Sequence, residues 1–240
     1  MRVVVVTGAT RGLGLAIAHQ CITDGYKVIA VGRTMTDQLA ELMRRHAEQI
    51  VFECYDFFDT AGIHSFAVGL VKQHGRPWGL VNNAAIGTDG VLATLHERDI
   101  ADLIKINIEA PVLLTKYLSR AMLLNGGGRI INVSSIIAST GFNGLSVYGA
   151  TKAALAGFTK SLSREVGRAN ITVNTLAPGF METDMTSKLQ SYKLDSIRRR
   201  SPSGQLASVE DAAHAVSYLL SDKAERVTGI TMTVDAGTTA

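Results

Sequence analysis

The sequence predicts an α/β protein, a three-layer fold around a doubly wound parallel sheet. Short β-branched runs alternate with longer segments of helical periodicity along the 240 residues. The short runs are apolar nearly throughout rather than alternating, which is typical of strands covered by helices on both faces. No proline- or serine-rich linker and no internal repeat interrupts the series. We therefore expect one domain over residues 1–240.

Seven runs are predicted as strands, with at least six helices between them. In chain order the strands are Val3–Val6, Lys27–Val31, Ile50–Cys54, Gly79–Asn82, Arg129–Ser134, Ile171–Leu176 and Thr231–Val234. Leu13–Asp24 is predicted as the first helix, and Asp99–Leu124 and Tyr148–Arg168 as two long ones. The stretch Thr183–Ser208 is polar, basic and without a strand, so we expect an insertion that covers the substrate site.

The composition excludes several classes of protein. Apolar residues make up 46% of the chain, which is enough for a buried core and too many for a disordered chain. A net charge of +3 does not favour a nucleic-acid partner, and no apolar run approaches the ~20 residues of a membrane span. The chain shows no signal-peptide pattern and its six histidines have no metal-ligand spacing. We expect a cytoplasmic protein without metal, in which Cys21 and Cys54 are core thiols.

A glycine-rich turn follows the first predicted strand and leads into a helix. Its spacing is G-x-x-x-G-x-G, not the G-x-G-x-x-G of the standard dinucleotide fingerprint. Glycines there would let the backbone approach a pyrophosphate, with the helix N-terminus facing the anion. The alternative is an ordinary loop that needs positive φ, but its place on the first βαβ unit favours a dinucleotide site. The candidate residues are Gly8, Thr10, Arg11, Gly12, Leu13 and Gly14.

The end of the second predicted strand indicates the choice of cofactor. An acidic residue there would bind the 2′-hydroxyl of NAD, whereas an arginine suits the 2′-phosphate of NADP. The sequence reads Val31-Gly32-Arg33-Thr34, with no acidic residue before Asp37. Arg33, together with Arg11, is a candidate phosphate clamp, and the alternative is two arginines that only solvate the surface. We therefore expect NADP(H).

A serine, a tyrosine and a lysine form a candidate catalytic group. Ser135 follows the fifth predicted strand, and Tyr148 and Lys152 are four residues apart on one helix face. In carbonyl reduction Tyr148 would donate a proton to the developing alkoxide, which Ser135 would also bind. Lys152 would bind the nicotinamide ribose and lower the tyrosine pKa from its usual ~10. The alternative is a packed aromatic ring and a solvated lysine.

With these motifs the chain resembles the short-chain dehydrogenase/reductase family over nearly its whole length. The matching residues are Thr7–Gly14, Asn82–Ala85, Asn107, Ser135, Tyr148 with Lys152, and Asn174–Gly179. The resemblance implies an NAD(P)-binding Rossmann fold with strand order 3-2-1-4-5-6-7. It also implies a catalytic tetrad of Asn107, Ser135, Tyr148 and Lys152. Within it, Asn107 would help to hold a water that joins Lys152 to a proton relay.

The resemblance implies further cofactor contacts. Asp56, followed by Phe57, matches the acid that receives the adenine amino group. Asn82 and Ala84 match the segment that runs along the adenine ribose. The loop that holds the nicotinamide carboxamide is matched by Pro178, Gly179, Met181 and Thr183.

Within the family, the stretch Ala177–Met185 is most similar to the 3-oxoacyl-acyl carrier protein reductases of fatty-acid synthesis. Such enzymes reduce a 3-oxoacyl thioester with NADPH, usually as homotetramers, so the resemblance implies a substrate on acyl carrier protein or coenzyme A. Two alternatives remain: a reductase of another ketone, sugar or polyketide, and a dinucleotide sensor without turnover. The run Arg198-Arg199-Arg200 is either a solvated helix face or a surface that steers an acidic carrier or a coenzyme A phosphate.

Overall fold

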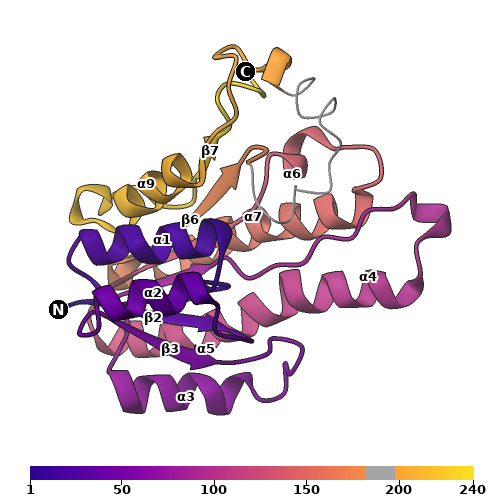
Figure 1. The fold of residues 1–240 in the computed structure, drawn as a ribbon. Helices are drawn as coiled ribbons and strands as arrows, with labels where there is room; N and C mark the ends of the chain where they lie inside the picture. The colour runs from indigo at the N-terminus through magenta and orange to yellow at the C-terminus, as the bar shows by residue number, and fades with distance from the viewer. Residues whose placement is uncertain (182–197) are drawn as a thin grey trace.

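A seven-stranded sheet in the order β3-β2-β1-β4-β5-β6-β7 forms the centre of the molecule (Figure 1). The computed structural model describes residues 1–181 and 198–240. The strands are β1 (Val3–Thr7), β2 (Lys27–Gly32), β3 (Ile50–Cys54), β4 (Gly79–Asn82), β5 (Gly128–Val133), β6 (Ile171–Pro178) and β7 (Thr231–Val234). Every neighbouring pair is parallel, so the carboxyl ends of the strands share one edge of the sheet. The predicted fold class and strand order are confirmed.

Helices cover both faces of this sheet (Figure 1). One face packs against α1 (Gly12–Thr23), α2 (Asp37–Arg45) and α9 (Val209–Leu220). The other packs against α3 (Ile63–His74), α5 (Ala110–Leu124) and α7 (Ser146–Val166). Two further helices, α4 (Glu97–Ile104) and α6 (Ile137–Thr140), precede α5 and α7 respectively.

β1 shows why the strands are apolar throughout. Val4 and Val6 belong to the core cluster on the α1 and α9 side. Val3 and Val5 belong to the cluster on the α3 and α5 side. Since successive side chains of a strand point to opposite faces, both sets must be apolar when helices cover both faces. The edge strand β7 differs, because its residues alternate between exposed and half-buried.

Three sequence predictions about single elements are wrong. One continuous helix was expected over Asp99–Leu124. The structure has α4 and α5 joined by a π-helical segment, Lys105–Glu109, in which backbone hydrogen bonds join residues five apart instead of four. The fifth strand ends at Val133, so Ser134 already lies beyond it. Cys21 is buried as expected, but Cys54 is exposed because it ends β3, near the edge of the sheet.

Most of the predicted cover over residues 183–208, including Thr183, lies outside the described residues. In the part that is described, Arg199 and Arg200 are exposed and Ser208 caps α9. None of the described helices is long and apolar enough to cross a membrane. The described ranges also bring together no group of three or more side chains that could hold a metal ion.

Candidate active site

The glycine-rich turn between β1 and α1 is tight at three positions. Gly8 and Gly12 have φ values of +64° and +52°, which favour glycine. A Cβ on Gly8 would lie 2.9 Å from the Cα of Ala84, and a Cβ on Gly14 would overlap the carbonyl oxygen of Gly8. Side chains at these positions would therefore open the turn and displace it from β4.

Thr7 and Asn83 fix the turn to the end of β4. The Thr7 hydroxyl accepts hydrogen bonds from the backbone N–H groups of Asn83 and Ala84 at 3.0 and 2.9 Å. The Asn83 side-chain amide donates to the carbonyls of Thr7 and Gly8 at 2.9 and 3.2 Å. Asn83 was not predicted as a site residue, although its place directly after a buried strand could have indicated it.

The N-terminus of α1 fits a dinucleotide phosphate. Its N-cap residue, Arg11, has an extended backbone and makes no side-chain cap, and the first turn contains no acidic residue. The first N–H groups of a helix have no partner within the helix and attract anions. α2, by contrast, is capped by the Thr36 side chain. The residues of the turn are therefore suited to hold the pyrophosphate of NAD(P).

Arg33 and Arg11 lie next to a close contact between β2 and the turn. A Cβ on Gly32 would overlap the methyl group of Thr10, and the Thr36 hydroxyl donates to the Thr10 carbonyl at 2.6 Å. Arg11 directly follows Thr10, and Arg33 directly follows Gly32. Both arginines are exposed at this edge. The backbones of Arg11 and Arg33 therefore lie on the two sides of the contact between Thr10 and Gly32.

Asp56 and Phe57 follow β3 and differ in burial. Asp56 is exposed, and its carboxylate accepts a hydrogen bond from the backbone N–H of Phe58 at 3.0 Å. Phe57 is buried in the core cluster on the α3 side. Only Asp56 of the two therefore offers a side chain to a ligand at this edge.

Ser135, Tyr148 and Lys152 come together where β5 ends and α7 begins. Tyr148 is the third residue of α7, and its hydroxyl is hydrogen-bonded to Ser135. The Lys152 nitrogen lies 5.7 Å from the centre of the Tyr148 ring. The Ser135 oxygen also accepts from the Ile137 N–H at 3.2 Å, which holds its side chain in place. The three predicted residues thus form one cluster.

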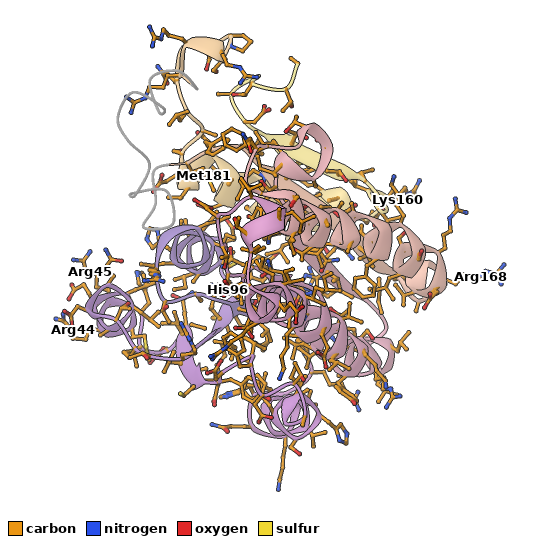
Figure 2. The ribbon with its side chains drawn as sticks, turned by 90° about the vertical axis from the view of Figure 1, so that its right-hand side faces the viewer. Arg44, Arg45, His96, Lys160, Arg168 and Met181 are labelled. Atoms are coloured by element: carbon orange, nitrogen blue, oxygen red, sulfur yellow. The ribbon has the colours of Figure 1, made fainter. Side chains whose placement is uncertain are left out.

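Lys152 is buried, with 3% of its surface exposed, and is tied to β5. Its ammonium donates to the carbonyl of Val133 at 2.9 Å, and the Ser134 hydroxyl donates to the Lys152 carbonyl at 2.7 Å. Lys160, two turns further along α7, is exposed and points away from the sheet (Figure 2). The alternative of a solvated lysine therefore fits Lys160 and not Lys152.

The expected lowering of the Tyr148 pKa is not what this site produces. Burial raises the pKa of Tyr148 to about 12, although the hydrogen bond with Ser135 acts in the opposite direction. Burial also lowers the pKa of Lys152 to about 8. Both shifts have one cause, because removing a group from water disfavours its charged form. At neutral pH the phenol is protonated and the amine charged.

Asn107 lies in the π-helical segment between α4 and α5, and 1% of its surface is exposed. Its amide oxygen accepts from the Ile86 N–H at 2.9 Å. Its two N–H groups donate to the Ile86 carbonyl at 3.0 Å and to the Thr151 hydroxyl at 3.1 Å. The side chain thus joins the segment after β4 to α7. The water relay that the resemblance assigns to Asn107 stays a prediction.

Thr151 links this amide to the catalytic turn and was missed by the sequence analysis. Its hydroxyl accepts from Asn107 and donates to the Tyr148 carbonyl at 2.8 Å. Thr151 is buried, with 1% of its surface exposed. A threonine three residues after the tyrosine is a recognisable signal, since such hydroxyls bond backward to the preceding turn.

The side chain of Asn82 belongs to a buried polar network between the sheet and the helices α5 and α7. Its amide donates to Thr115 at 2.9 Å and to Asn132 at 2.8 Å. The Asn132 amide donates to Thr159 at 2.9 Å, and Thr175 is bonded to the same hydroxyl at 2.9 Å. This network ties β4, β5 and β6 to α5 and α7. Contacts of Asn82 and Ala84 with a cofactor ribose remain a prediction.

The end of β6 lies beside the end of β5, next to Ser135. The Ile136 N–H donates to the Pro178 carbonyl at 3.1 Å, and the Gly179 N–H donates to Val234 at 2.9 Å. A Cβ on Gly179 would lie 2.7 Å from the Cβ of Asp235, so the position is close-packed. Met181 is buried in the core cluster on the α1 and α9 side.

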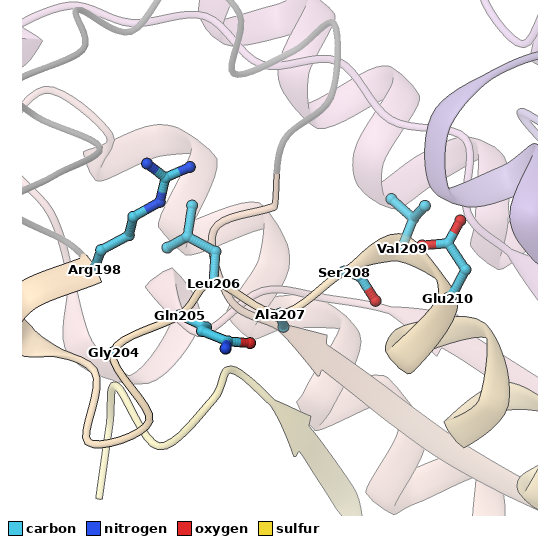
Figure 3. A pocket seen from close by; sticks show the side chains of 8 residues that line it. All are labelled: Arg198, Gly204, Gln205, Leu206, Ala207, Ser208, Val209 and Glu210. Atoms are coloured by element: carbon cyan, nitrogen blue, oxygen red, sulfur yellow. The ribbon is translucent and has the colours of Figure 1, made fainter.

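A separate hollow of about 530 Å³ lies near residues 198–210. Figure 3 shows Arg198 opposite the strip Gly204–Glu210, whose side chains form the rest of the lining. No member of the tetrad lines this hollow. The catalytic cluster and the hollow are therefore distinct features of the described chain.

Comparisons with known proteins agree with this geometry. Residues 2–193 match the short chain dehydrogenase family. The 3-oxoacyl-acyl-carrier-protein reductase of Escherichia coli is 36% identical over 238 residues, and that of Pseudomonas aeruginosa 37% over 241 residues. Each alignment covers 98% of this chain and 96% of the relative.

Two solved structures share the fold at full length. A gluconate 5-dehydrogenase of Burkholderia cenocepacia, in complex with NADP and tartrate, has a TM-score of 0.94 and 28% identity, covering 99% of this chain and 95% of that one. A structure named as an NAD(P) dependent gluconate 5-dehydrogenase of Beutenbergia cavernae, with bound NADP, has a TM-score of 0.93 and 32% identity, covering 98% and 96%. The chain therefore belongs to the short-chain dehydrogenase family and is an oxidoreductase of that family.

Proposed function

We propose that this protein reduces a 3-oxoacyl thioester to the 3-hydroxyacyl thioester with NADPH, and that Tyr148 is the proton donor. One observation carries the proposal. A half-buried tyrosine that is protonated at neutral pH is bonded to Ser135 and lies beside the charged Lys152. This arrangement suits the delivery of a proton to a carbonyl oxygen.

Each side chain of the cluster has a distinct part in the reaction. When bound, NADPH supplies a hydride to the carbonyl carbon. Tyr148 transfers its hydroxyl proton to the carbonyl oxygen, so that the C=O group becomes CH–OH. Ser135 donates a hydrogen bond to the same oxygen and stabilises its developing negative charge. Lys152 stabilises the phenolate that remains on Tyr148 until a proton from solvent replaces the one transferred.

The preference for NADPH over NADH is supported by the end of β2. Arg33 is exposed there, next to Arg11 across the contact between Gly32 and Thr10. A pair of guanidinium groups binds a 2′-phosphate and gives no acceptor to a 2′-hydroxyl. Both similar solved structures are described with NADP, which agrees with this choice.

The thioester substrate is supported by the full-length similarity to two 3-oxoacyl-acyl-carrier-protein reductases. The acyl group would be carried by acyl carrier protein or coenzyme A. The reaction would be a step of fatty-acid synthesis, and the enzyme would act in the cytoplasm. The exposed Arg199 and Arg200 suit an acidic carrier or a coenzyme A phosphate. A homotetramer is part of this proposal, and light scattering at several protein concentrations would test it.

A second candidate substrate is a keto form of a sugar acid. The two similar solved structures carry the name gluconate 5-dehydrogenase, at 28% and 32% identity. The catalytic cluster would act in the same way on such a ketone. A sensor without turnover is disfavoured, because Ser135, Tyr148 and Lys152 are all present and Tyr148 lies near both of the others.

A substrate panel distinguishes these candidates. NADPH oxidation is followed with acetoacetyl-acyl carrier protein, acetoacetyl-coenzyme A and 5-ketogluconate, and each assay is repeated with NADH. We expect the highest kcat/KM with a thioester and NADPH. A higher kcat/KM with 5-ketogluconate than with either thioester would show that the substrate is the sugar acid. Binding of NADPH without turnover of any of the three would instead indicate a sensor.

A further inference from the structure

Phe142 and Phe180 form an aromatic pair on two segments that adjoin the catalytic residues. Their ring centres are 5.6 Å apart and the ring planes are inclined by 58°. Phe142 lies in the loop between α6 and α7, and Phe180 follows the end of β6. Two segments that are distant in the sequence thus present their rings to each other.

Backbone hydrogen bonds hold this pair close to the catalytic residues. The Ile136 N–H, directly after Ser135, donates to the carbonyl of Pro178, two residues before Phe180. The loop that contains Phe142 begins after α6 and leads into the first turn of α7, which carries Tyr148. Phe142 therefore lies on the segment that joins Ser135 to Tyr148, and Phe180 lies on a segment that is hydrogen-bonded to the residue after Ser135.

The loop conformation is set by the backbone and not by the Phe142 side chain. Gly141 and Gly144, on either side of it, have φ values of +68° and +81°. The Gly144 carbonyl accepts from the Gly90 N–H at 2.9 Å, and the Leu145 N–H donates to the Phe142 carbonyl at 3.1 Å. A substitution of the ring at Phe142 should therefore leave the loop in place.

The two rings do not serve the hydrophobic core. Phe142 is 45% exposed, and neither ring belongs to the two core clusters that lie on the faces of the sheet. Phe180 is half-buried. A partly exposed pair of apolar rings on segments that adjoin a catalytic group is typical of a ligand-binding wall. Two aromatic faces favour contact with methylene groups and offer no hydrogen bonds to a polyhydroxylated chain.

We propose that Phe142 and Phe180 form the wall that contacts the hydrocarbon tail of the 3-oxoacyl substrate and sets the preference for acyl chain length. This inference rests on the proposed function and specifies its substrate side. The thioester carbonyl end reacts at Tyr148, and the tail beyond the reacting carbonyl lies along the two rings. Each additional methylene that contacts the wall increases the binding of the transition state.

The experiment compares two substrates of the same chemistry. The ratio of kcat/KM for 3-oxooctanoyl-coenzyme A to kcat/KM for acetoacetyl-coenzyme A is measured with NADPH for the wild type and for Phe142→Ala, Phe180→Ala and the double variant. Tyr218→Ala is the matched control, because Tyr218 is an aromatic residue on α9 with a similar exposed fraction, 40%. Thermal melts confirm that each variant is folded, and Phe142→Ser gives a second, more polar change at the exposed position.

We expect the ratio to fall by about tenfold or more in the double variant, since four methylenes then lose an apolar wall. Tyr218→Ala should leave the ratio unchanged. A fall of less than about threefold in the folded double variant, or an equal fall in Tyr218→Ala, overturns the inference. A wild-type protein that reduces neither thioester contradicts the proposed function and this inference together. A wild type that reduces both, with a ratio independent of the two rings, contradicts only the inference.

Discussion

The Lys152 ammonium lies 5.7 Å from the centre of the Tyr148 ring, and burial shifts the pKa values of the two groups in opposite directions. The pKa of Tyr148 rises to about 12 and that of Lys152 falls to about 8. At neutral pH the tyrosine therefore keeps its proton while the lysine keeps its charge. Proton donation from Tyr148 needs this combination, because the ammonium stabilises the phenolate as it forms.

The pH dependence of reduction should report the titration of Lys152. With a pKa of about 8, its ammonium is present below this pH and is lost above it. We expect kcat/KM to be constant up to about pH 8 and then to decrease by about tenfold per pH unit. The check is the pH profile of NADPH oxidation at limiting acetoacetyl-coenzyme A. A profile that stays flat to pH 10 would show that the charge of Lys152 is not needed.

Lys152→Met should lose activity and gain stability at neutral pH. The folded-state pKa of about 8 lies below the ordinary lysine pKa of 10.5, so the unfolded chain binds more protons between these values. The free energy of unfolding of the wild type therefore rises with pH from about 8 to 10.5. Below about pH 8 the buried ammonium destabilises the folded state by its full amount. We expect the variant to be more stable by about 1–2 kcal/mol at pH 7, after the loss of its hydrogen bond to Val133.

Urea unfolding of the wild type and of Lys152→Met at pH 7 and pH 10 measures this effect. The stability difference should shrink at pH 10, where the wild-type amine is neutral in the folded state. Lys160→Met is the control, since Lys160 is exposed on the same helix and should show no such change. A Lys152→Met protein that is less stable than the wild type at pH 7 contradicts the argument.

Arg33→Asp should reverse the choice of cofactor. The change removes a charged contact to the 2′-phosphate and places an acceptor where the 2′-hydroxyl of NADH would lie. We expect the ratio of kcat/KM for NADPH to that for NADH to fall by about 100-fold or more, the equivalent of one or two charge-assisted hydrogen bonds. Arg168→Asp, a change of an exposed arginine after α7 (Figure 2), controls for net charge. An unchanged ratio in Arg33→Asp would remove Arg33 from the cofactor site.

Thr151 should act as a positioning residue. Thr151→Val keeps the shape of the side chain but removes its bonds to Asn107 and to the Tyr148 carbonyl. We expect kcat to fall by about tenfold, with a much smaller change in KM for NADPH, because the tyrosine moves away from its reactive position. Thr151→Ser restores the hydroxyl and should restore kcat. Equal losses in the valine and serine variants would show that packing matters and not the hydrogen bonds.

The strands and the catalytic cluster could be predicted because their signals are local. A strand covered on both faces must be apolar throughout, as in β1, and two residues four apart on a helix must share a face, as Tyr148 and Lys152 do. Ser135 was found because carboxyl ends of parallel strands line a crevice. These inferences depend on periodicity and chain order alone.

The parts that could not be predicted depend on contacts between distant segments. The π-helical turn at Asn107 cannot be seen in a continuous helical pattern, since the pattern on either side of it is helical. The pKa of Tyr148 was expected to fall because Lys152 was considered without the burial of both side chains. The exposed thiol of Cys54 and the aromatic pair of Phe142 and Phe180 likewise follow from the way the chain folds at the edge of the sheet.

The central claim is that Tyr148 donates the proton in carbonyl reduction, and one variant tests it most directly. Steady-state NADPH oxidation with acetoacetyl-coenzyme A is measured for the wild type and for Tyr148→Phe, alongside the Kd of each protein for NADPH. The account predicts turnover by the wild type, a loss of about 10²–10⁴ in kcat for the variant and a Kd for NADPH that changes little. A Tyr148→Phe protein that keeps wild-type kcat while binding NADPH normally would contradict it.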